Sequence, residues 1–309
     1  MAIDVDPPSG RQWDIGHGSQ LATIVEVGGG LRAYVVGDRP VVDGYDRTEM
    51  CSGGRGQLLM PWPNRIRDGR YRFAGADRQL DLSEPAYGNA IHGLVRWAAW
   101  RVIELAASRV SLGHRLHPRP GYPFTLDLRV DYELDDGGLS VRTTAMNVGA
   151  RPCPFGSGAH PYVRLREGSV DGALLLVPAQ SLLETDGRHL PTGGPAPVEG
   201  TAFDFRTPRP IGALALDTAF TELERDAAGV ARVVLASSDG AEQVAVWQDA
   251  AHPYVMVYSG DTLGEVDRRR RGLAVEPMTC APDAFNSGEG LRVLQPGERF
   301  SGTWGISAI

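Results

Sequence analysis

The clearest pattern in the chain is a strict alternation of apolar and polar residues over residues 124–134. Because successive side chains of a strand point to opposite faces, this period of two predicts a long strand with one solvated face. Residues 135–138 then supply a turn, and residues 139–148 are expected to return as the neighbouring strand.

Shorter segments of the same kind run through the rest of the chain. Two pairs flank glycine-containing turns and are expected to form hairpins: residues 22–27 with 31–36, and residues 230–237 with 243–248. Asp68-Gly69, within residues 67–73, predicts a third hairpin. Three further strands are expected at residues 253–259, 272–275 and 299–306.

Helical periodicity is nearly absent. Residues 217–223 are the exception, and they are expected to make one or two helical turns with Asp217 as the N-cap. The 39 glycines and 22 prolines are spread along the whole chain, which suits many short connections. No linker or break in composition divides the chain, so we expect a single all-β domain over residues 1–309, built as one large antiparallel β-sandwich.

Composition and charge exclude several functions. The net charge of −7 argues against nucleic acid as the main partner. All 31 basic residues are arginine, which excludes Schiff-base catalysis, attachment of pyridoxal phosphate and a P-loop lysine. The chain has neither a GxGxxG segment that opens a helix nor a GxSxG elbow. Four consecutive arginines, residues 268–271, are expected to form a solvated loop tip.

No segment predicts contact with a membrane. No apolar stretch approaches the ~20 residues that a membrane helix needs, and residues 1–16 lack the basic and apolar regions of a signal peptide. Cys51, Cys153 and Cys280 show no CxxC spacing and are interpreted as reduced thiols. We therefore expect a cytoplasmic protein.

Glu276 is the first candidate for chemistry. It ends a short apolar run and is followed by Pro277. Because proline cannot donate to a ladder, we expect the strand to end there and to direct its last side chains out of the sheet. A glutamate in that place is either an ordinary surface residue or a group with a functional partner.

Candidate partners stand beside residues that stiffen the chain. Pro61 and Pro63 are expected to hold Asn64 and Arg65 in an extended segment. Arg65 can donate two parallel hydrogen bonds to a pair of hydroxyls or to a carboxylate, or it can cap a loop by bonding backbone carbonyls.

Three more polar residues have unusual neighbours. His92 precedes Gly93, which allows another group to approach the backbone closely. His160 follows the small residues 156–159 and precedes a proline, and Asp217 lies just before an apolar pair. Each residue also has an ordinary structural interpretation, as a half-buried or loop histidine and as an N-cap.

Together these residues fit two kinds of site. One is metal-free acid–base catalysis on a small polar substrate. The other is a metal ion held by His92, His160 and Glu276, two imidazoles and a carboxylate. The spacings do not decide between them, because the residues come from distant strands.

Seven segments in order resemble the aldose 1-epimerase (galactose mutarotase) family: GQLLMPWPNRIRDGRYRFAG, NAIHG, GAHPYV, LDTAF, VYSGD, VEPMTCAPDAFN and VLQPGE. The resemblance extends from about Leu21 to Ile306. It implies a supersandwich of the galactose mutarotase type with a sugar cleft on its concave face. It also implies no metal and no other cofactor, which favours the first kind of site.

The resemblance further implies a role for each candidate. Glu276 matches the general base that takes the proton of the C1 hydroxyl, and His160 matches the general acid that protonates the ring oxygen. We expect burial to raise the pKa of the glutamate towards neutrality, and a histidine with a pKa near 6.5 to carry the donated proton. The remaining matches are His92, which would hydrogen-bond near the same oxygens, and the sugar-binding candidates Arg65, Asp217 and the neighbouring Asn64.

The chain departs from the family at two places, and both concern which sugar is preferred. An HxYFNL-like segment is replaced by HPYVRL at residues 160–165, and Met256 stands where a glutamine often contacts the sugar. Two alternatives stay open: a hexose-6-phosphate 1-epimerase whose arginine run binds the phosphate, and a carbohydrate-binding protein without catalysis. We expect a small-molecule sugar as the partner, no nucleic acid or membrane, and a monomer or homodimer.

Overall fold

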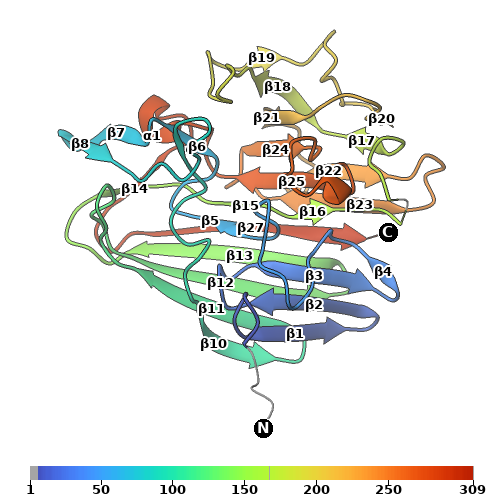
Figure 1. Ribbon diagram of the computed structural model, residues 1–309, viewed down its shortest axis with the longest axis horizontal. Coiled ribbons are helices and arrows are strands. Elements are labelled where there is room, and N and C mark those ends of the chain that lie inside the picture. Colours follow the sequence, from blue (N-terminus) through green and yellow to red (C-terminus); the bar gives the residue numbers. More distant parts are fainter. Residues whose placement is uncertain (1–5, 167, 309) are drawn as a thin grey trace.

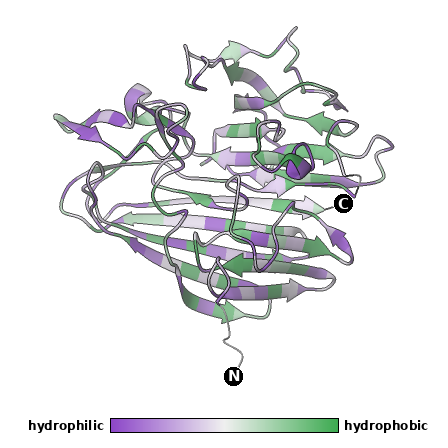
Figure 2. Cartoon of the chain, viewed as in Figure 1, coloured by the Kyte–Doolittle hydropathy of each residue, from purple (hydrophilic) through white to green (hydrophobic). Residues whose placement is uncertain are grey.

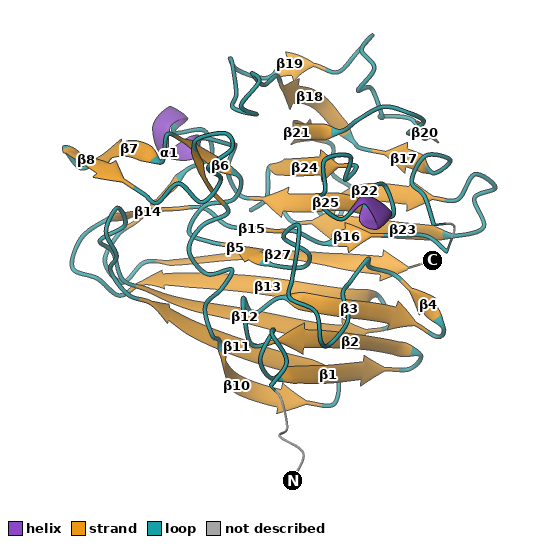
Figure 3. Cartoon of the chain, in the orientation of Figure 1, coloured by secondary structure: helices purple, strands orange, loops and turns teal. Residues whose placement is uncertain are grey.

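A computed structural model describes residues 6–166 and 168–308, and its regular structure is almost entirely strand (Figures 1 and 3). Antiparallel sheets of nine, eight and four strands account for most of it. The prediction of an all-β antiparallel sandwich is confirmed. No described helix is both long and apolar enough to cross a bilayer.

The sheets have the following strand orders. The nine-stranded sheet runs β10 (Arg101–Ala106), β11 (Arg109–Leu116), β12 (Leu126–Asp135), β13 (Gly138–Asn147), β27 (Arg299–Ala308), β23 (Gln243–Gln248), β22 (Ala231–Ala236), β17 (Leu174–Leu176) and β20 (Arg209–Pro210). The eight-stranded sheet runs β19 (Ala196–Pro197), β18 (Ala179–Leu183), β21 (Asp217–Leu223), β24 (Tyr254–Tyr258), β25 (Leu273–Met278), β15 (Gly158–Ala159) and β5 (Leu58–Leu59), with β16 (Tyr162–Val163) also paired to β25. The four-stranded sheet runs β1 (Gln12–His17), β2 (Gln20–Val25), β3 (Leu31–Val36) and β4 (Arg39–Pro40).

Smaller elements complete the described chain. Three strand pairs are β14 (Cys153–Phe155) with β26 (Arg292–Leu294), β6 (Arg65–Arg67) with β9 (Asn89–Ile91), and β7 (Arg70–Phe73) with β8 (Ala76–Gln79). The helical elements are the single turns η1 (Val266–Arg268) and α1 (Ala284–Ser287).

The layers pack through one extensive apolar core. The four-stranded sheet contacts the nine-stranded sheet at β11 and β12, and the eight-stranded sheet approaches it where β25 meets β23 (Figure 1). A continuous cluster of buried apolar side chains runs from Ile15 in β1 to Ile306 in β27. The other face of β25 carries Ala274 and Met278, which belong to two smaller clusters. The strands of the eight-stranded sheet that flank the site are therefore buried on both faces.

The strongest sequence pattern predicts its strands correctly. The apolar positions of β12 are buried and the intervening ones are exposed or half-buried, so colours alternate along this strand in Figure 2. β12 pairs with β13 from Asp135 opposite Gly138 to Leu126 opposite Asn147. The expected hairpins β2–β3 and β22–β23 are also present.

One predicted helix and one predicted hairpin are wrong. Residues 217–223 form strand β21, because they pair with β18 on one side and with β24 on the other. Long-range pairing here overrides a helical pattern too short to be stable alone. Asp68 and Gly69 do adopt the positive φ of a tight turn, but the strands on either side pair elsewhere, β6 with β9 and β7 with β8.

Candidate functional site

A cavity of about 220 Å³ opens against the face of the eight-stranded sheet that carries the smaller apolar clusters. A larger cavity of about 590 Å³, beside Trp97 and Arg119, contains none of the candidate residues. The smaller cavity collects all six of them: Asn64, Arg65, His92, His160, Asp217 and Glu276.

The register of the sheet explains why distant residues meet on the cavity floor. Strand β24 places Met256 opposite Glu276. On the other side of β25, Gly158 lies opposite Met278 and Tyr162 opposite Ala274. Counting inward from these two pairs places His160 directly opposite Glu276. Side chains of directly opposed residues share one face of a sheet, so the imidazole and the carboxyl emerge side by side.

Strand β25 does not end at Pro277, as the sequence suggested, but continues to Met278. The N–H groups of Val275 and Thr279 donate to the carbonyls of Pro161 (3.1 Å) and Ser157 (2.9 Å). Pro277 lies between these two donors and has no N–H of its own, so it interrupts the ladder without ending it. Glu276 consequently stays inside the sheet and is only 2% exposed.

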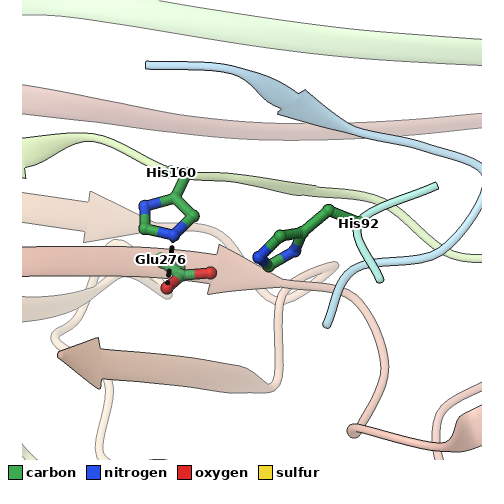
Figure 4. Close-up of side chains that lie close together, drawn as sticks. All are labelled: His92, His160 and Glu276. Atoms are coloured by element: carbon green, nitrogen blue, oxygen red, sulfur yellow. Dashed lines mark ion pairs between the residues drawn. The ribbon is translucent and has the colours of Figure 1, made fainter. Parts of the chain in front are cut away.

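The residues expected as acid and base, His160 and Glu276, are in direct contact. His160 Nε2 lies 3.2 Å from Glu276 Oε1 (Figure 4). The His160 ring stacks on Tyr162 with a centroid distance of 4.9 Å, and it meets the His92 ring edge to face at 5.3 Å. The Tyr162 hydroxyl donates to the Gly53 carbonyl (2.9 Å), which fixes the ring that supports His160.

Burial controls the protonation of this pair. Desolvation raises the pKa of Glu276 well above its usual value, with a further increase from Asp217 and an opposing effect from Arg65. Desolvation, together with the positive charge of Arg96, lowers the pKa of His160 to about 3. The expected direction for Glu276 is confirmed, whereas a pKa near 6.5 for His160 is wrong. Burial therefore favours the neutral form of each group, a protonated carboxyl and an uncharged imidazole.

Two buried polar atoms of the pair have no hydrogen-bond partner, Glu276 Oε2 and His160 Nδ1. A buried polar atom without a partner costs roughly 1–3 kcal/mol. Such atoms are uncommon in folded proteins, and at a cavity they indicate a place where a polar ligand completes the hydrogen bonding.

His92 is held in one tautomer by the backbone of Asn64. The Asn64 N–H donates to His92 Nδ1 (3.2 Å), and the His92 N–H donates to the Asn64 carbonyl (2.9 Å). Since Nδ1 accepts, the neutral ring carries its proton on Nε2 and can donate from there. Both residues have positive φ, 61° and 53°, a strained conformation that often marks functional sites.

Gly93 allows the close backbone approach that the sequence predicted. A Cβ atom at this position would lie 2.0 Å from the Met60 carbonyl oxygen. The segment that carries His92 therefore packs directly on the chain just after β5, and a larger residue would displace His92 from the cavity.

Arg65 binds a carboxylate and does not cap a loop. Its Nε and Nη2 donate to both oxygens of Glu84, at 2.9–3.2 Å. Both side chains are largely buried, at 9% and 16% exposure, and the guanidinium lies 6.0 Å from the Tyr87 ring centroid. Nη1 takes no part in this ion pair. The Asn64 side chain accepts from the Arg65 N–H (2.9 Å), which fixes Asn64 as well.

Asp217 has a partner that the sequence did not reveal. Its Oδ2 lies 2.9 Å from His189 Nδ1, and His189 also lines the cavity. Glu84, Tyr87, Tyr162 and Tyr258 are further lining residues that sequence reasoning missed. Their only sequence signal is a polar or aromatic residue near a strand end or turn, which is too common to select them.

The donor set could also accept a metal ion. One ligand atom from each of His92, His160 and Glu276 lies within 4.8 Å of the other two. Two imidazoles and a carboxylate suit a divalent transition metal. His92 can contribute only Nε2 without breaking its bond to Asn64.

The arginine run does not reach the cavity. Arg268 donates to the Gly44 carbonyl and to Glu49, Arg270 pairs with Asp171 and Asp261, and Arg271 pairs with Asp43. The Arg268 side chain is only 12% exposed, so the prediction of a solvated loop tip is wrong. None of the four arginines lines the cavity that holds Glu276.

Comparisons with solved structures agree with this architecture. A GalM/aldose epimerase homologue from C. elegans superposes with a TM-score of 0.86 at 20% identity, covering 97% of this chain and 98% of the other. Galactose 1-epimerase from Lactobacillus acidophilus superposes with a TM-score of 0.81 at 21% identity, covering 96% and 94%. At this level of identity the similarity establishes the fold.

Sequence comparisons extend the similarity to the family. An uncharacterized protein of Escherichia coli, YihR, is 36% identical over 291 residues, or 94% of this chain and 91% of YihR. Human galactose mutarotase is 29% identical over 268 residues, or 78% of this chain and 74% of the human protein. The family model for aldose 1-epimerase matches residues 11–307. The chain therefore belongs to the aldose 1-epimerase family.

Proposed function

We propose that this protein interconverts the α and β anomers of a free aldohexose by acid–base ring opening and closing. One observation carries the proposal: a buried imidazole and a buried carboxyl group lie 3.2 Å apart in a small polar cavity. The hydroxyl oxygen and the ring oxygen of a cyclic sugar are attached to the same carbon, C1. A reaction that moves a proton at each of them needs an acid and a base this close together.

The proposed reaction has three steps. The Glu276 carboxylate takes the proton of the C1 hydroxyl, the C1 oxygen forms a carbonyl, the bond between C1 and the ring oxygen breaks, and that oxygen takes a proton from His160. Rotation about C1–C2 then presents the other face of the carbonyl. The same two groups reverse their roles to close the ring, and no proton is gained or lost.

The active protonation state forms within the pair. The reaction needs a carboxylate and an imidazolium, whereas burial favours a carboxylic acid and a neutral imidazole. Both states contain one proton, so its transfer across the 3.2 Å contact interconverts them. Sugar hydroxyls that bond the unpaired Glu276 Oε2 would stabilise the carboxylate, since hydrogen bonds to a charged form favour that form.

The remaining residues bind and orient the sugar in this proposal. His92 donates from Nε2 near the reacting oxygens, because its Nδ1 is already bonded to Asn64. Arg65 offers Nη1 to a sugar hydroxyl while Glu84 holds its other nitrogens. Asp217 accepts hydrogen bonds from sugar hydroxyls. Asn64 orients two of the other residues, since its N–H donates to His92 Nδ1 and its side chain accepts from the Arg65 N–H.

The charges at the cavity favour a free sugar over a hexose 6-phosphate. Three carboxyl groups line it, those of Glu84, Asp217 and Glu276, against one arginine. That arginine is already paired with Glu84, and the arginines of residues 268–271 are occupied elsewhere. A phosphate dianion would find no unpaired cation among these groups.

Location and assembly remain proposals. All three cysteines are free and buried, which suits the cytoplasm that we expect from the sequence. The proposed partner is a small-molecule sugar, and we propose a monomer or homodimer that binds neither nucleic acid nor membrane.

Polarimetry of freshly dissolved α-glucose, α-galactose and their 6-phosphates tests the function. We expect the protein to accelerate mutarotation of at least one free hexose, with little effect on the phosphates. We also expect full activity after dialysis against a chelator, because the pair acts without a metal. Sugar binding without acceleration would contradict the proposal and favour a binding protein, and loss of activity on chelation would favour the metal site.

A further inference from the structure

The cavity is lined by a second histidine–carboxylate pair, His189 and Asp217. His189 Nδ1 lies 2.9 Å from Asp217 Oδ2, and both side chains are about three-quarters buried, at 28% and 27% exposure. The register Asp217–Tyr258–Ala274 places Asp217 two strands away from β25 and two residues along from Glu276. Strand spacing puts the two Cα positions roughly 12 Å apart, so a sugar whose C1 lies at Glu276 extends towards Asp217.

The loop that carries His189 is rigidly built. The Asp186 side chain accepts from the N–H groups of Arg188 and Leu190, and the Asp186 carbonyl accepts from the His189 N–H. These bonds hold His189 at a φ of 58°, a conformation that residues other than glycine seldom adopt. Strain of this kind persists only where surrounding contacts impose it, and it is common at ligand sites.

Arg188 fastens the loop to the opposite wall of the cavity. Its guanidinium donates to the carbonyls of Tyr87 (2.8 Å) and Gly88 (3.0 Å) and to the side chain of Asn89 (3.1 Å), and Asn89 donates back to the Arg188 carbonyl (3.2 Å). The Tyr87 ring then meets the His189 ring edge to face at 4.9 Å. The Arg65 guanidinium lies over the same tyrosine ring, so Tyr87 contacts both Arg65 and His189.

We propose that His189 is a substrate-positioning residue. It fixes the Asp217 carboxylate so that the other carboxylate oxygen accepts hydrogen bonds from the sugar hydroxyls remote from C1. The inference rests on the proposed function, because it takes the ligand to be a sugar with C1 at Glu276. The His189 Nδ1 atom lies 2.9 Å from one carboxylate oxygen of Asp217, and both residues line the cavity. A carboxylate that is already oriented loses less freedom on binding, so this pair governs sugar affinity and leaves proton transfer unaffected.

Two substitutions at this position separate hydrogen bonding from packing. His189→Phe keeps a ring against Tyr87 but removes the ring nitrogen that contacts Asp217. His189→Asn keeps a donor near the position of Nδ1, and asparagine tolerates positive φ. We expect His189→Phe to raise KM about tenfold and to change kcat less than about twofold, and His189→Asn to restore most of the loss.

The double variant His189→Phe/Asp217→Asn shows whether the histidine acts through Asp217. If it does, the phenylalanine adds nothing to the KM of Asp217→Asn, because the group that it positions is already altered. An equal KM increase in both backgrounds, or a KM in His189→Phe equal to that of the wild type, would overturn the proposal. The ratio of kcat/KM for glucose and galactose, which differ at C4, should change in His189→Phe and not in His189→Asn.

Binding measured by calorimetry keeps this inference distinct from the proposed function. A wild-type protein that binds hexose without accelerating mutarotation overturns the function, while weaker binding by His189→Phe would still support the role of His189. Acceleration by the wild type with unaltered binding in His189→Phe overturns only the role of His189. No hexose binding to the wild type would overturn both.

Discussion

Two antiparallel strand pairs in this molecule use polar side chains in opposite ways. In β12 and β13 apolar side chains are buried, while most of the polar ones between them face outward, so the pair stabilises the sandwich. In β25 every residue is buried, yet one of them is Glu276. The neighbouring strand β24 contributes Met256 opposite this carboxyl group. The function that we propose depends on this buried polar residue.

The largest expected effect on activity comes from replacing the buried carboxyl group of Glu276. Glu276→Gln keeps the shape of the side chain but removes the base, so we expect mutarotation to slow by about 10³-fold while the protein folds normally. The measurement is polarimetry with circular dichroism as the check on folding. The matched control is Glu133→Gln on the exposed face of β12, which should retain full activity. Equal activity in the two variants would remove Glu276 from the mechanism.

A second substitution tests β12 and β13, the strand pair that stabilises the sandwich. Leu126 of β12 is fully buried in the main core, and Leu126→Ala should lower the free energy of unfolding by about 3 kcal/mol through lost burial and a cavity. We expect the rate per folded molecule to change less than about twofold, because β12 does not reach the acid–base pair. Urea unfolding and polarimetry at a temperature well below the transition provide both numbers. A large loss of kcat in folded protein would show that the two regions are coupled.

The sequence predicted the pairing of β12 with β13 better than the pairing of β25 with residues 158–162, for a physical reason. The alternation in β12 is local, so it can be read without knowing the partner strand. The pairing of Glu276 with His160 depends on register between β25 and residues 158–162, which no local pattern encodes. The family resemblance supplied that pairing, and the structure places both side chains at one cavity.

The errors have the same origin. The chain at Asp68-Gly69 turns as expected, but the partners of β6 and β7 lie elsewhere along the chain. Residues 217–223 are a strand because two neighbours complete their hydrogen bonds. His189 was missed because its contacts with Asp217 and Tyr87 form only after folding.

The free energy of unfolding should depend on pH differently for the carboxyl groups of the two regions, Glu276 in β25 and Asp127 in β12. Burial raises the pKa of Glu276, so the folded state binds more protons than the unfolded state between the ordinary value and the raised one. The resulting stability is complete below about pH 4.3 and is lost as the pH rises through the folded pKa, by up to about 1.4 kcal/mol per pH unit. Glu276→Gln should therefore gain stability relative to the wild type as the pH rises from about 4.3 through the folded pKa of Glu276. A difference independent of pH would show that the carboxyl group is not desolvated.

Replacing Asp127 in β12 should have the smallest effect on the free energy of unfolding, and this effect should depend on pH in the opposite direction. Arg115 donates to its two oxygens at 2.6 and 2.8 Å, and this hydrogen bonding lowers the pKa of Asp127. The stability from this pair is present above about pH 3.9 and is lost as the pH falls through the folded pKa. Both side chains are about half exposed, so Asp127→Asn should cost only about 0.5 kcal/mol at pH 7.

Urea unfolding at pH 3, 5, 7 and 9 compares Asp127→Asn and Glu276→Gln with the wild type. We expect the loss in Asp127→Asn to vanish towards pH 3, and we expect the stability of Glu276→Gln relative to the wild type to increase as the pH rises above about 4.3. Opposite slopes would follow from one cause, because a solvated carboxyl group gains from its charged partner, whereas a buried one has to give up hydration to ionise. Slopes of the same sign would mean that the buried carboxyl group is already compensated, and the proton on the His160–Glu276 pair would then rest on the imidazole before any sugar binds.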